Sequence, residues 1–304
     1  MSAFGVIGFG DVGKAIVEGV FEQRGTRTPV YCAGERNRPP YSPAFREKVD
    51  TAGGRLVDMP DELAAAATTL FSAVVPATAL AAVGDFVPHL QPEHLFVDLN
   101  SCSPRTKESM AETVTARGAT FADAALVGSP RQLGIQMPFI ASGDGAARFR
   151  DETAPLGMTV DVLDAPAGAA ALLKMLRSIL TKGIAALAIE LLVTALRAGI
   201  PEEALRQSFE DLERRGLTAR ATWFARTTCI HAGRRAGEMD EVIATLAEYG
   251  VPSFTATATR SWLATVASLD LKEHFGGEPP ADHLTAIRAI EARLGSRSRH
   301  PEDV

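Results

Sequence analysis

The segment VIGFGDVGKAI, residues 6–16, restricts the possible folds of this chain more than any other. It places a G-x-G-x-x-G motif, formed by Gly8, Gly10 and Gly13, between an apolar strand-like run and a helical stretch. In a strand–turn–helix unit the first glycine permits the tight turn, the second lets backbone approach a pyrophosphate, and the third lets the helix pack on the strand. An ordinary glycine turn is the alternative, but the context favours dinucleotide binding.

The first half of the chain alternates short β-rich runs with helical stretches. The β-rich runs are residues 4–8, 28–33, 68–75, 94–100, 120–126, 138–143 and 159–164, and the clearest helical stretches are residues 11–23, 60–67 and 103–118. Such alternation indicates βαβ units and a largely parallel sheet. The sequence therefore predicts an α/β fold in which residues 1–165 form a Rossmann-type dinucleotide-binding domain.

The pattern changes near residue 165. No proline occurs from Ala167 to Ala198, which permits one helix of roughly 45 Å at about 1.5 Å per residue. Beyond it the pattern stays helical, so we expect residues 166–304 to form an all-α domain that this long helix joins to the first. Apolar residues run almost all round the helix and would be covered by a partner chain, so we also expect a homodimer.

Composition argues against several classes of protein. The net charge of −6 is unlike that of a general nucleic-acid-binding protein. Cys32, Cys102 and Cys229 form no C-x-x-C pair and the histidines are scattered, so we expect a reducing compartment and no metal site. No charged leader precedes the first strand, and the apolar run 185–196 is shorter than the ~20 residues that span a bilayer. We expect a cytoplasmic protein without membrane association.

The residues after the second predicted strand bear on the choice between NAD and NADP. An NAD site has Asp or Glu about 20 residues after the glycine loop, whereas this strand ends in Ala33-Gly34 and leads into Glu35, Arg36, Asn37 and Arg38. Two arginines favour a 2′-phosphate, while Glu35 suits ribose hydroxyls, and a solvated charged loop is a third interpretation. We predict NADP, with NAD possible, bound by Gly8, Phe9, Gly10, Asp11, Val12, Gly13, Arg36, Asn37, Arg38, Val75, Pro76 and Asn100.

A short polar stripe interrupts the long apolar helix. Its members lie at i, i+3, i+4, i+7 and i+8 and share one face: Lys174, Arg177, Ser178, Thr181 and Lys182. A solvated face would continue, but the next positions on it are Ala185 and Ile189. Polar side chains confined to about two turns of an apolar helix favour a stripe that faces a cleft, with a solvated face as the alternative.

Four segments occur in an order that resembles the β-hydroxyacid dehydrogenases, a family that includes the 6-phosphogluconate and 3-hydroxyisobutyrate dehydrogenases. These segments are the glycine motif, VDLNSCSP at residues 97–104, DAALVGSP at residues 123–130 and GAAALLKMLRS at residues 168–178. The resemblance implies a Rossmann-type domain, a long interdomain helix, a helical domain that dimerises, and an active site in the cleft between domains.

The resemblance is partial at the positions that hold substrate in the family. Residues 98–101 are similar to the family's Asp-x-Ser-Thr segment, but residues 127–129 read Val-Gly-Ser where the family has Ser-Gly-Gly. The family's catalytic lysine corresponds to Lys174, and its asparagine one turn later corresponds to Ser178. Its later Lys-Asp pair is absent, and Arg234 stands nearby. The chain thus resembles a divergent branch whose substrate does not follow from the family.

Hydride transfer between a secondary alcohol and a nicotinamide also requires a proton to move to or from the oxygen. A lysine partly desolvated by apolar neighbours has a lowered pKa, which suits Lys174 as a general base or acid. The expected substrate-binding residues are Ser101, Gly128, Ser129, Ser178, Lys182 and Arg234, and the expected substrate is small and acidic. A surface ion pair is an equal alternative for Lys182 and Arg234, and the role of His231 stays open.

These observations predict an NADP-dependent oxidoreductase that acts on a small β-hydroxy acid or the related carbonyl compound. An imine reductase-like enzyme is one alternative, and the proton donor in such enzymes is typically not a lysine. A non-catalytic protein that senses NADP is another, although sensing requires no proton donor.

Overall fold

The computed structural model describes residues 3–34 and 37–297. The chain divides into two compact units, Met1–Ser178 and Ile179–Val304. Helix α8 (Ala169–Arg197) belongs to both units, because it begins in the first and continues into the second. The predicted domain boundary at residue 165 lies just before this helix begins.

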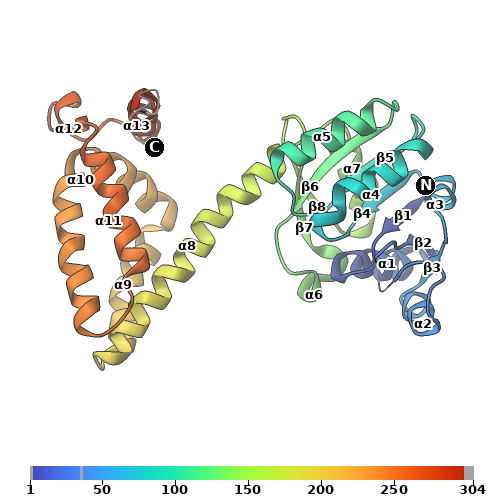
Figure 1. The fold of residues 1–304 in the computed structure, drawn as a ribbon, viewed down its shortest axis with the longest axis horizontal. Coiled ribbons are helices and arrows are strands. Elements are labelled where there is room, and N and C mark those ends of the chain that lie inside the picture. The colour runs from blue at the N-terminus through green and yellow to red at the C-terminus, as the bar shows by residue number, and fades with distance from the viewer. Residues whose placement is uncertain (1–2, 35–36, 298–304) are drawn as a thin grey trace. The chain divides into compact units, whose positions relative to one another are not determined.

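The first unit is built on a single sheet of eight strands in the order β3-β2-β1-β4-β5-β6-β7-β8 (Figure 1). The strands are β1 (Phe4–Ile7), β2 (Thr28–Tyr31), β3 (Gly54–Leu56), β4 (Thr69–Ser72), β5 (Leu95–Asp98), β6 (Thr120–Leu126), β7 (Pro138–Ser142) and β8 (Thr159–Val162). Every neighbouring pair is parallel except β6 and β7. The predicted Rossmann-type sheet is confirmed, and the short strand β3 was missed.

Helices cover both faces of this sheet. They are α1 (Asp11–Arg24), α2 (Pro43–Thr51), α3 (Pro60–Ala66), α4 (Ala79–Phe86), α5 (Pro104–Thr115), α6 (Pro130–Leu133) and α7 (Ala146–Thr153), with 3-10 turns η1 (Pro76–Thr78), η2 (Val87–His89), η3 (Gly134–Gln136) and η4 (Ala154–Leu156). Alternate strand residues enter different cores: Phe71 and Val97 pack with α1 and α7, whereas Leu70 and Phe96 pack with α3, α4 and α5. Burial on both faces explains why the strands read as continuous apolar runs.

A row of polar side chains crosses the middle of the sheet. Ser72 of β4 is in register with Asp98 of β5, Asp98 with Asp123 of β6, and Asp123 with Ser142 of β7. All four side chains are completely buried. Buried polar groups require partners, so this row predicts a hydrogen-bonded network at the ends of β4 and β5.

The second unit contains the rest of α8 and five further described helices. These are α9 (Pro201–Arg215), α10 (Leu217–Glu248), α11 (Phe254–Ala267), α12 (Leu271–His274) and α13 (His283–Arg297). The carboxylate of Glu190 on α8 accepts hydrogen bonds of 2.9 Å from the main-chain N–H groups of Thr255 and Ala256 at the start of α11. A side-chain carboxylate thus caps α11, and the expected all-α composition is confirmed for the described residues.

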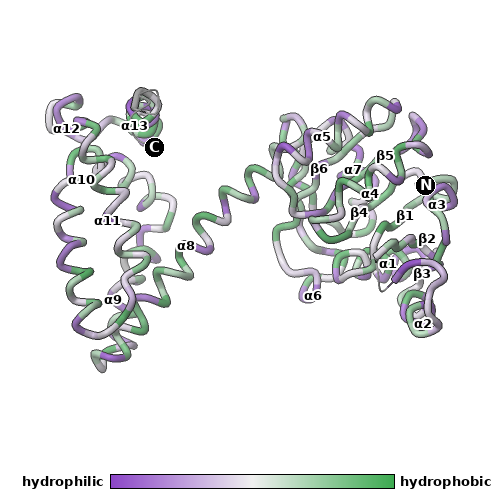
Figure 2. The backbone as a smooth tube through the Cα atoms, viewed as in Figure 1, coloured by the Kyte–Doolittle hydropathy of each residue, from purple (hydrophilic) through white to green (hydrophobic). Residues whose placement is uncertain are grey.

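Helix α8 is exposed along most of its length in the single chain. Ile179, Ile189 and Leu196 are 73%, 64% and 68% exposed, and apolar residues recur along the helix in Figure 2. Periodicity shows which residues of the helix are apolar but not what covers them, and in one chain the apolar residues around the polar stripe are largely exposed. The 29-residue helix is also long and apolar enough to span a membrane, so the length argument from residues 185–196 does not apply to it.

Candidate functional site

A cavity of about 750 Å³ opens where the strand order reverses, between β1 and β4. Its walls are residues 7–10, residues 31–34, Asn37, residues 73–75, Thr78, Ala81, Ala82, Asp85 and Phe86. In open parallel sheets, ligands bind at such a reversal beyond the carboxyl ends of the strands. Gly8 and Gly10 of the predicted motif line this cavity together with Val75, and the cavity has the position of a dinucleotide site.

Each glycine of the motif has a separate structural reason. Gly8 adopts a φ of +92°, and a Cβ there would lie 2.5 Å from the carbonyl oxygen of Ala73. A Cβ on Gly13 would lie 2.3 Å from the carbonyl oxygen of Gly8. A Cβ on Gly10 would meet no protein atom within 4 Å. Gly8 and Gly13 are therefore required by the turn and its packing, whereas the space beside Gly10 is free for a ligand.

The remaining predicted cofactor residues lie at or near this cavity, except where the chain is not described. Phe9 lines it and makes an edge-on contact with Phe45. Val12 packs against the core, and Pro76 begins η1 after β4. Asp11 is the first residue of α1 and forms an exposed ion pair of 3.0 Å with Arg131.

The end of the cavity near β2 contains residues that sequence reasoning had missed. Tyr31, Cys32 and Asp85 line it together with the predicted Asn37. Burial raises the pKa of the Cys32 thiol to about 12, so this cysteine stays protonated and unreactive at neutral pH. Arg38 is exposed nearby in the chain, and Arg36 lies outside the described residues. Nothing in the sequence marks Asp85 as a cavity residue, except that it is the one charged residue of helix α4.

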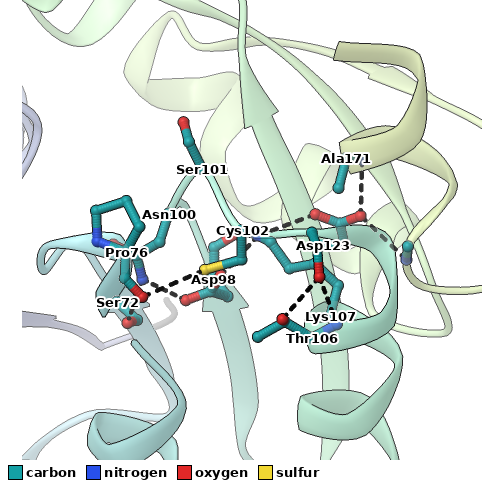
Figure 3. Close-up of polar contacts among 12 residues, drawn as sticks. Ser72, Pro76, Asp98, Asn100, Ser101, Cys102, Thr106, Lys107, Asp123 and Ala171 are labelled. Carbon is teal, nitrogen blue, oxygen red and sulfur yellow. Dashed lines mark hydrogen bonds and ion pairs between the residues drawn. The ribbon is translucent and has the colours of Figure 1, made fainter. Parts of the chain in front are cut away.

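Two of the predicted site residues, 73 positions apart, meet directly. Lys174 in the second turn of α8 donates a hydrogen bond of 2.6 Å from Nζ to Ser101 Oγ. Ser101 is exposed in the loop after β5, and its hydroxyl points away from the buried groups beneath it (Figure 3). The Ser178 hydroxyl, one turn after Lys174, donates to the Lys174 carbonyl oxygen at 3.2 Å. The Lys174 ammonium and the Ser101 hydroxyl thus lie next to each other at a partly exposed place in the first unit.

The other predicted residues are distributed more widely. Asn100 is buried, and its amide nitrogen donates to Asp98 and, at 3.0 Å, to Ser72 Oγ. Gly128, with a φ of +149°, and Ser129 precede α6 in the first unit. Lys182 is exposed on α8 within the second unit.

The structure places Arg234 on α10 of the second unit, where it pairs with Glu238. It lines a separate cavity of about 760 Å³ with His231 and Lys272. Within the part of the chain that the structure describes, no group of three or more His, Cys, Asp or Glu side chains is placed to hold a metal ion.

Sequence reasoning missed a buried ionic cluster, formed by Asp98, Lys107 and Asp123, beneath Ser101. Lys107 Nζ lies 2.6 Å from Asp98 Oδ2, 3.0 Å from Asp123 Oδ1 and 2.8 Å from the Asp98 carbonyl oxygen. Each of the three side chains is at most 1% exposed. The signal was present in the sequence, because Lys107 shares a helical stripe with the buried Met110 and Val114, a position where a charge is unusual.

Comparisons with known families agree with this geometry. Residues 3–151 match the NAD binding domain of 6-phosphogluconate dehydrogenase, and residues 195–266 match a domain of unknown function, DUF1932. A conserved protein of unknown function, described as structurally similar to 3-hydroxyacid dehydrogenases, is 28% identical, with 88% of this chain and 97% of that chain covered and a TM-score of 0.59.

More distant solved structures share the fold. A reductive aminase from Aspergillus terreus in complex with NADPH and ethyl levulinate is 17% identical, with 98% and 99% of the two chains covered and a TM-score of 0.70. An imine reductase from Streptomyces aurantiacus is 16% identical, with 96% and 99% covered and a TM-score of 0.72.

The chain belongs to the β-hydroxyacid dehydrogenase family. It is an NAD(P)-dependent oxidoreductase by family, fold and the position of its cavity. The fold is that of a soluble dehydrogenase, which argues against a membrane-spanning role for α8.

The different surroundings of Gly10 and Gly13 predict different consequences of adding a methyl group. Gly10→Ala should keep the free energy of unfolding within about 0.5 kcal/mol, because the new Cβ meets no protein atom. It should weaken NADPH binding by about tenfold or more, because the methyl group occupies the approach to the pyrophosphate. Gly13→Ala should instead destabilise the fold by about 1–3 kcal/mol through its contact with Gly8.

Urea unfolding and titration of NADPH fluorescence measure the two effects separately. Tight NADPH binding by a fully folded Gly10→Ala variant would contradict the assignment of the cavity.

Proposed function

We propose that this protein is an NADP-dependent oxidoreductase that transfers a hydride between NADP and a small β-hydroxy acid or the related carbonyl compound, with Lys174 as general acid and base. The hydrogen bond of 2.6 Å between Lys174 and Ser101 carries this proposal, because it joins a titratable group to a hydroxyl at one partly exposed position. Bound NADP supplies the hydride acceptor for oxidation, and NADPH the hydride donor for reduction.

Lys174 and Ser101 would transfer the proton and orient the substrate. In the oxidation, neutral Lys174 accepts the hydroxyl proton while the hydride leaves the carbinol carbon, so a C=O bond forms as the O–H and C–H bonds break. In the reduction, the Lys174 ammonium returns a proton to the carbonyl oxygen. Ser101 Oγ accepts a hydrogen bond from Lys174 and can donate its own O–H to a substrate oxygen.

An acidic substrate is supported by the charges that follow Lys174 on α8. Arg177 and Lys182 lie on the same helical face, and Lys182 is two turns further on. A carboxylate is stabilised by nearby ammonium and guanidinium groups.

Imine reduction is the competing enzymatic function. It is supported by the shared fold of the imine reductase and the reductive aminase, at identities of 16% and 17%. The lysine argues against it, because a C=N bond is reduced after the nitrogen is protonated, and an ammonium group beside Ser101 would repel that iminium cation. Turnover of a panel of hydroxy acids, ketones and cyclic imines with NADP or NADPH separates the two, and NADP binding without any turnover favours a sensing protein.

The exposed apolar residues of the second unit support a homodimer. Its buried apolar core is small and centres on Cys229, Ile230 and Leu271, whereas Phe254 is 80% and Trp262 61% exposed. Large apolar side chains exposed in a single chain are often covered at subunit interfaces. A partner chain would also cover the exposed apolar neighbours of Lys174 on α8.

The proposed cofactor specificity predicts a selective loss of affinity. Replacing Arg36 and Arg38 by Ala should weaken NADPH binding far more than NADH binding, because each charge-assisted contact with the 2′-phosphate contributes on the order of 1.5–3 kcal/mol. Arg55→Ala, an exposed arginine on the adjacent strand β3, is the matched control and should change neither affinity. Tighter binding of NADH than of NADPH by the unmodified protein would disprove the preference.

The proposed dimer predicts a solution mass of twice the 32.2 kDa chain at micromolar concentrations. Ile189→Glu places a charge on an exposed apolar position of α8 and should shift the protein toward monomer, because a buried unpaired carboxylate is strongly unfavourable. Leu80→Glu is the control on an exposed apolar position of the first unit. Multi-angle light scattering measures all three proteins, and a monomeric mass for the unmodified chain rules the proposal out.

The proposed chemistry predicts that Lys174→Met lowers kcat by about 10²–10⁴-fold, the usual effect of losing a positioned acid or base. Lys174→Arg should fail as well, because a guanidinium group does not release its proton near neutral pH. The affinity for NADPH should stay nearly unchanged in both variants, since the glycine turn is untouched. The measurement is the kcat on a substrate found by the panel, under conditions where chemistry limits the rate. Turnover of Lys174→Met within a few-fold of the unmodified enzyme would move the proton transfer to another group.

A further inference from the structure

The buried ionic cluster of Asp98, Lys107 and Asp123 takes no part in the reaction proposed above, although it lies directly beneath Ser101 (Figure 3). Two carboxylates surround one ammonium group, so the cluster is one charge short of neutrality. Placing charges in the interior is unfavourable, and apolar residues of similar volume are often at least as stabilising. The cluster is therefore better explained by the geometry that it imposes than by a contribution to stability.

One side of the cluster holds the loop that carries Ser101. Lys107 Nζ contacts both the carboxylate and the carbonyl oxygen of Asp98, the last residue of β5. The Asp98 carboxylate also accepts a hydrogen bond from the side chain of Asn100, which donates a second hydrogen bond to Ser72 on β4. The residues on both sides of Leu99 are thus attached to the sheet, and Ser101 follows at once.

The other side of the cluster holds the start of α8. Asp123 Oδ1 contacts Lys107, while Asp123 Oδ2 accepts hydrogen bonds from the main-chain N–H groups of Gly168 at 3.1 Å and Ala171 at 3.0 Å. Ser142 Oγ accepts the neighbouring N–H group, that of Ala170, at 3.0 Å. Carboxylates at this end of a helix are favourable, because they satisfy N–H groups that have no partner within the helix. Lys174 follows Ala171 by one turn.

We propose that Asp98, Lys107 and Asp123 are positioning residues that hold Ser101 and Lys174 in hydrogen-bonding contact. Lys107 joins the loop of Ser101 to the first turn of α8 through a continuous series of buried contacts, so the two groups meet in one arrangement. The consequence for catalysis rests on the proposed role of Lys174, whereas the geometric effect does not. Burial alone lowers the pKa of Lys107, but the adjacent Asp98 and Asp123 raise it by more, so the ammonium is retained at neutral pH.

Asp123→Asn tests the proposal with almost no change in volume. An amide has one accepting oxygen, so it can cap α8 or face Lys107 with that oxygen, but its N–H₂ group must then oppose the other partner. We expect a folded protein in which kcat falls about 10–100-fold, the effect of displacing a catalytic group by about 1 Å. The Kd for NADPH should stay within twofold. Asp161→Asn, the same change at an exposed position of β8, is the matched control and should alter neither value.

The Lys174→Met background separates positioning from general disruption. If Asp123 acts through Lys174, Asp123→Asn should change the kcat of the Lys174→Met variant by less than about twofold, because coupled residues are not additive. A merely structural role predicts the same fractional loss in both backgrounds, and that result would overturn the proposal. Lys107→Arg keeps the charge but not the three contacts of the ammonium, and it replaces Asp123→Asn in both experiments if that variant does not fold.

The positioning role can also be tested without an enzyme assay, by measuring how accessible Lys174 is to a chemical label. Brief acetylation by acetic anhydride, followed by mass spectrometry, compares the labelling rate of Lys174 with that of the exposed Lys14 in the same sample. Ser101→Ala supplies the rate expected when the hydrogen bond to Lys174 is absent. Asp123→Asn should raise the Lys174 to Lys14 ratio toward the Ser101→Ala value, and Asp161→Asn should not.

The two readouts distinguish the possible failures. An increased labelling ratio with an unchanged kcat supports the positioning role and refutes Lys174 as the acid or base. An unchanged labelling ratio in folded Asp123→Asn and Lys107→Arg variants overturns the positioning role, whatever the effect on kcat.

Discussion

The register of the central strands places Ser72, Asp98, Asp123 and Ser142 in one buried row, and the geometry of the first unit depends on how that row is satisfied. The register leaves no freedom here, because a shift by one residue would turn the polar side chain of the shifted strand to the opposite face of the sheet. Lys107 reaches the row from α5, and the N–H groups that begin α8 reach it from the other side. Sheet, loop and helix therefore share one set of polar contacts.

The reversal of strand order provides the second element of the site. Because β1 pairs with β2 on one side and β4 on the other, the loops after these strands separate and leave the cavity that the glycine turn borders. The cavity is lined mainly by backbone and apolar side chains, with Asn37, Thr78 and Asp85 as polar exceptions, whereas Ser101 and Lys174 meet beyond the end of β5. The first unit thus places the dinucleotide cavity and the hydrogen-bonded pair of Ser101 and Lys174 at different strands of the same sheet.

The parts of the fold that follow from local sequence were predictable. Gly8 and Gly13 identify the first turn because no other residue fits the positions they occupy, and seven strands follow from apolar runs. Strand β3 has only three residues, with an exposed Arg55 in the middle, so it has no recognisable pattern. The family resemblance indicated Lys174 and Ser101 as separate site residues, but their contact was not predicted, since nothing local links residues 73 positions apart. Lys107 was missed because the carboxylates that pair with it lie on β5 and β6, and no local pattern links them to a charge within the apolar stripe of α5.

The buried cluster also restricts how this sequence can change over generations. Replacing Lys107 by an apolar residue leaves two buried carboxylates without a counter-charge, whereas replacing Asp98 or Asp123 leaves a neutral pair but removes the hydrogen-bond acceptor of Asn100 or of the start of α8. The three positions are therefore expected to change together. An apolar interior would require several simultaneous substitutions, because a single replacement leaves buried polar groups without their partners. Neighbouring surface positions such as Asp161 carry no such restriction and are free to drift. Related chains that have lost one member of the cluster are expected to have replaced the other two as well.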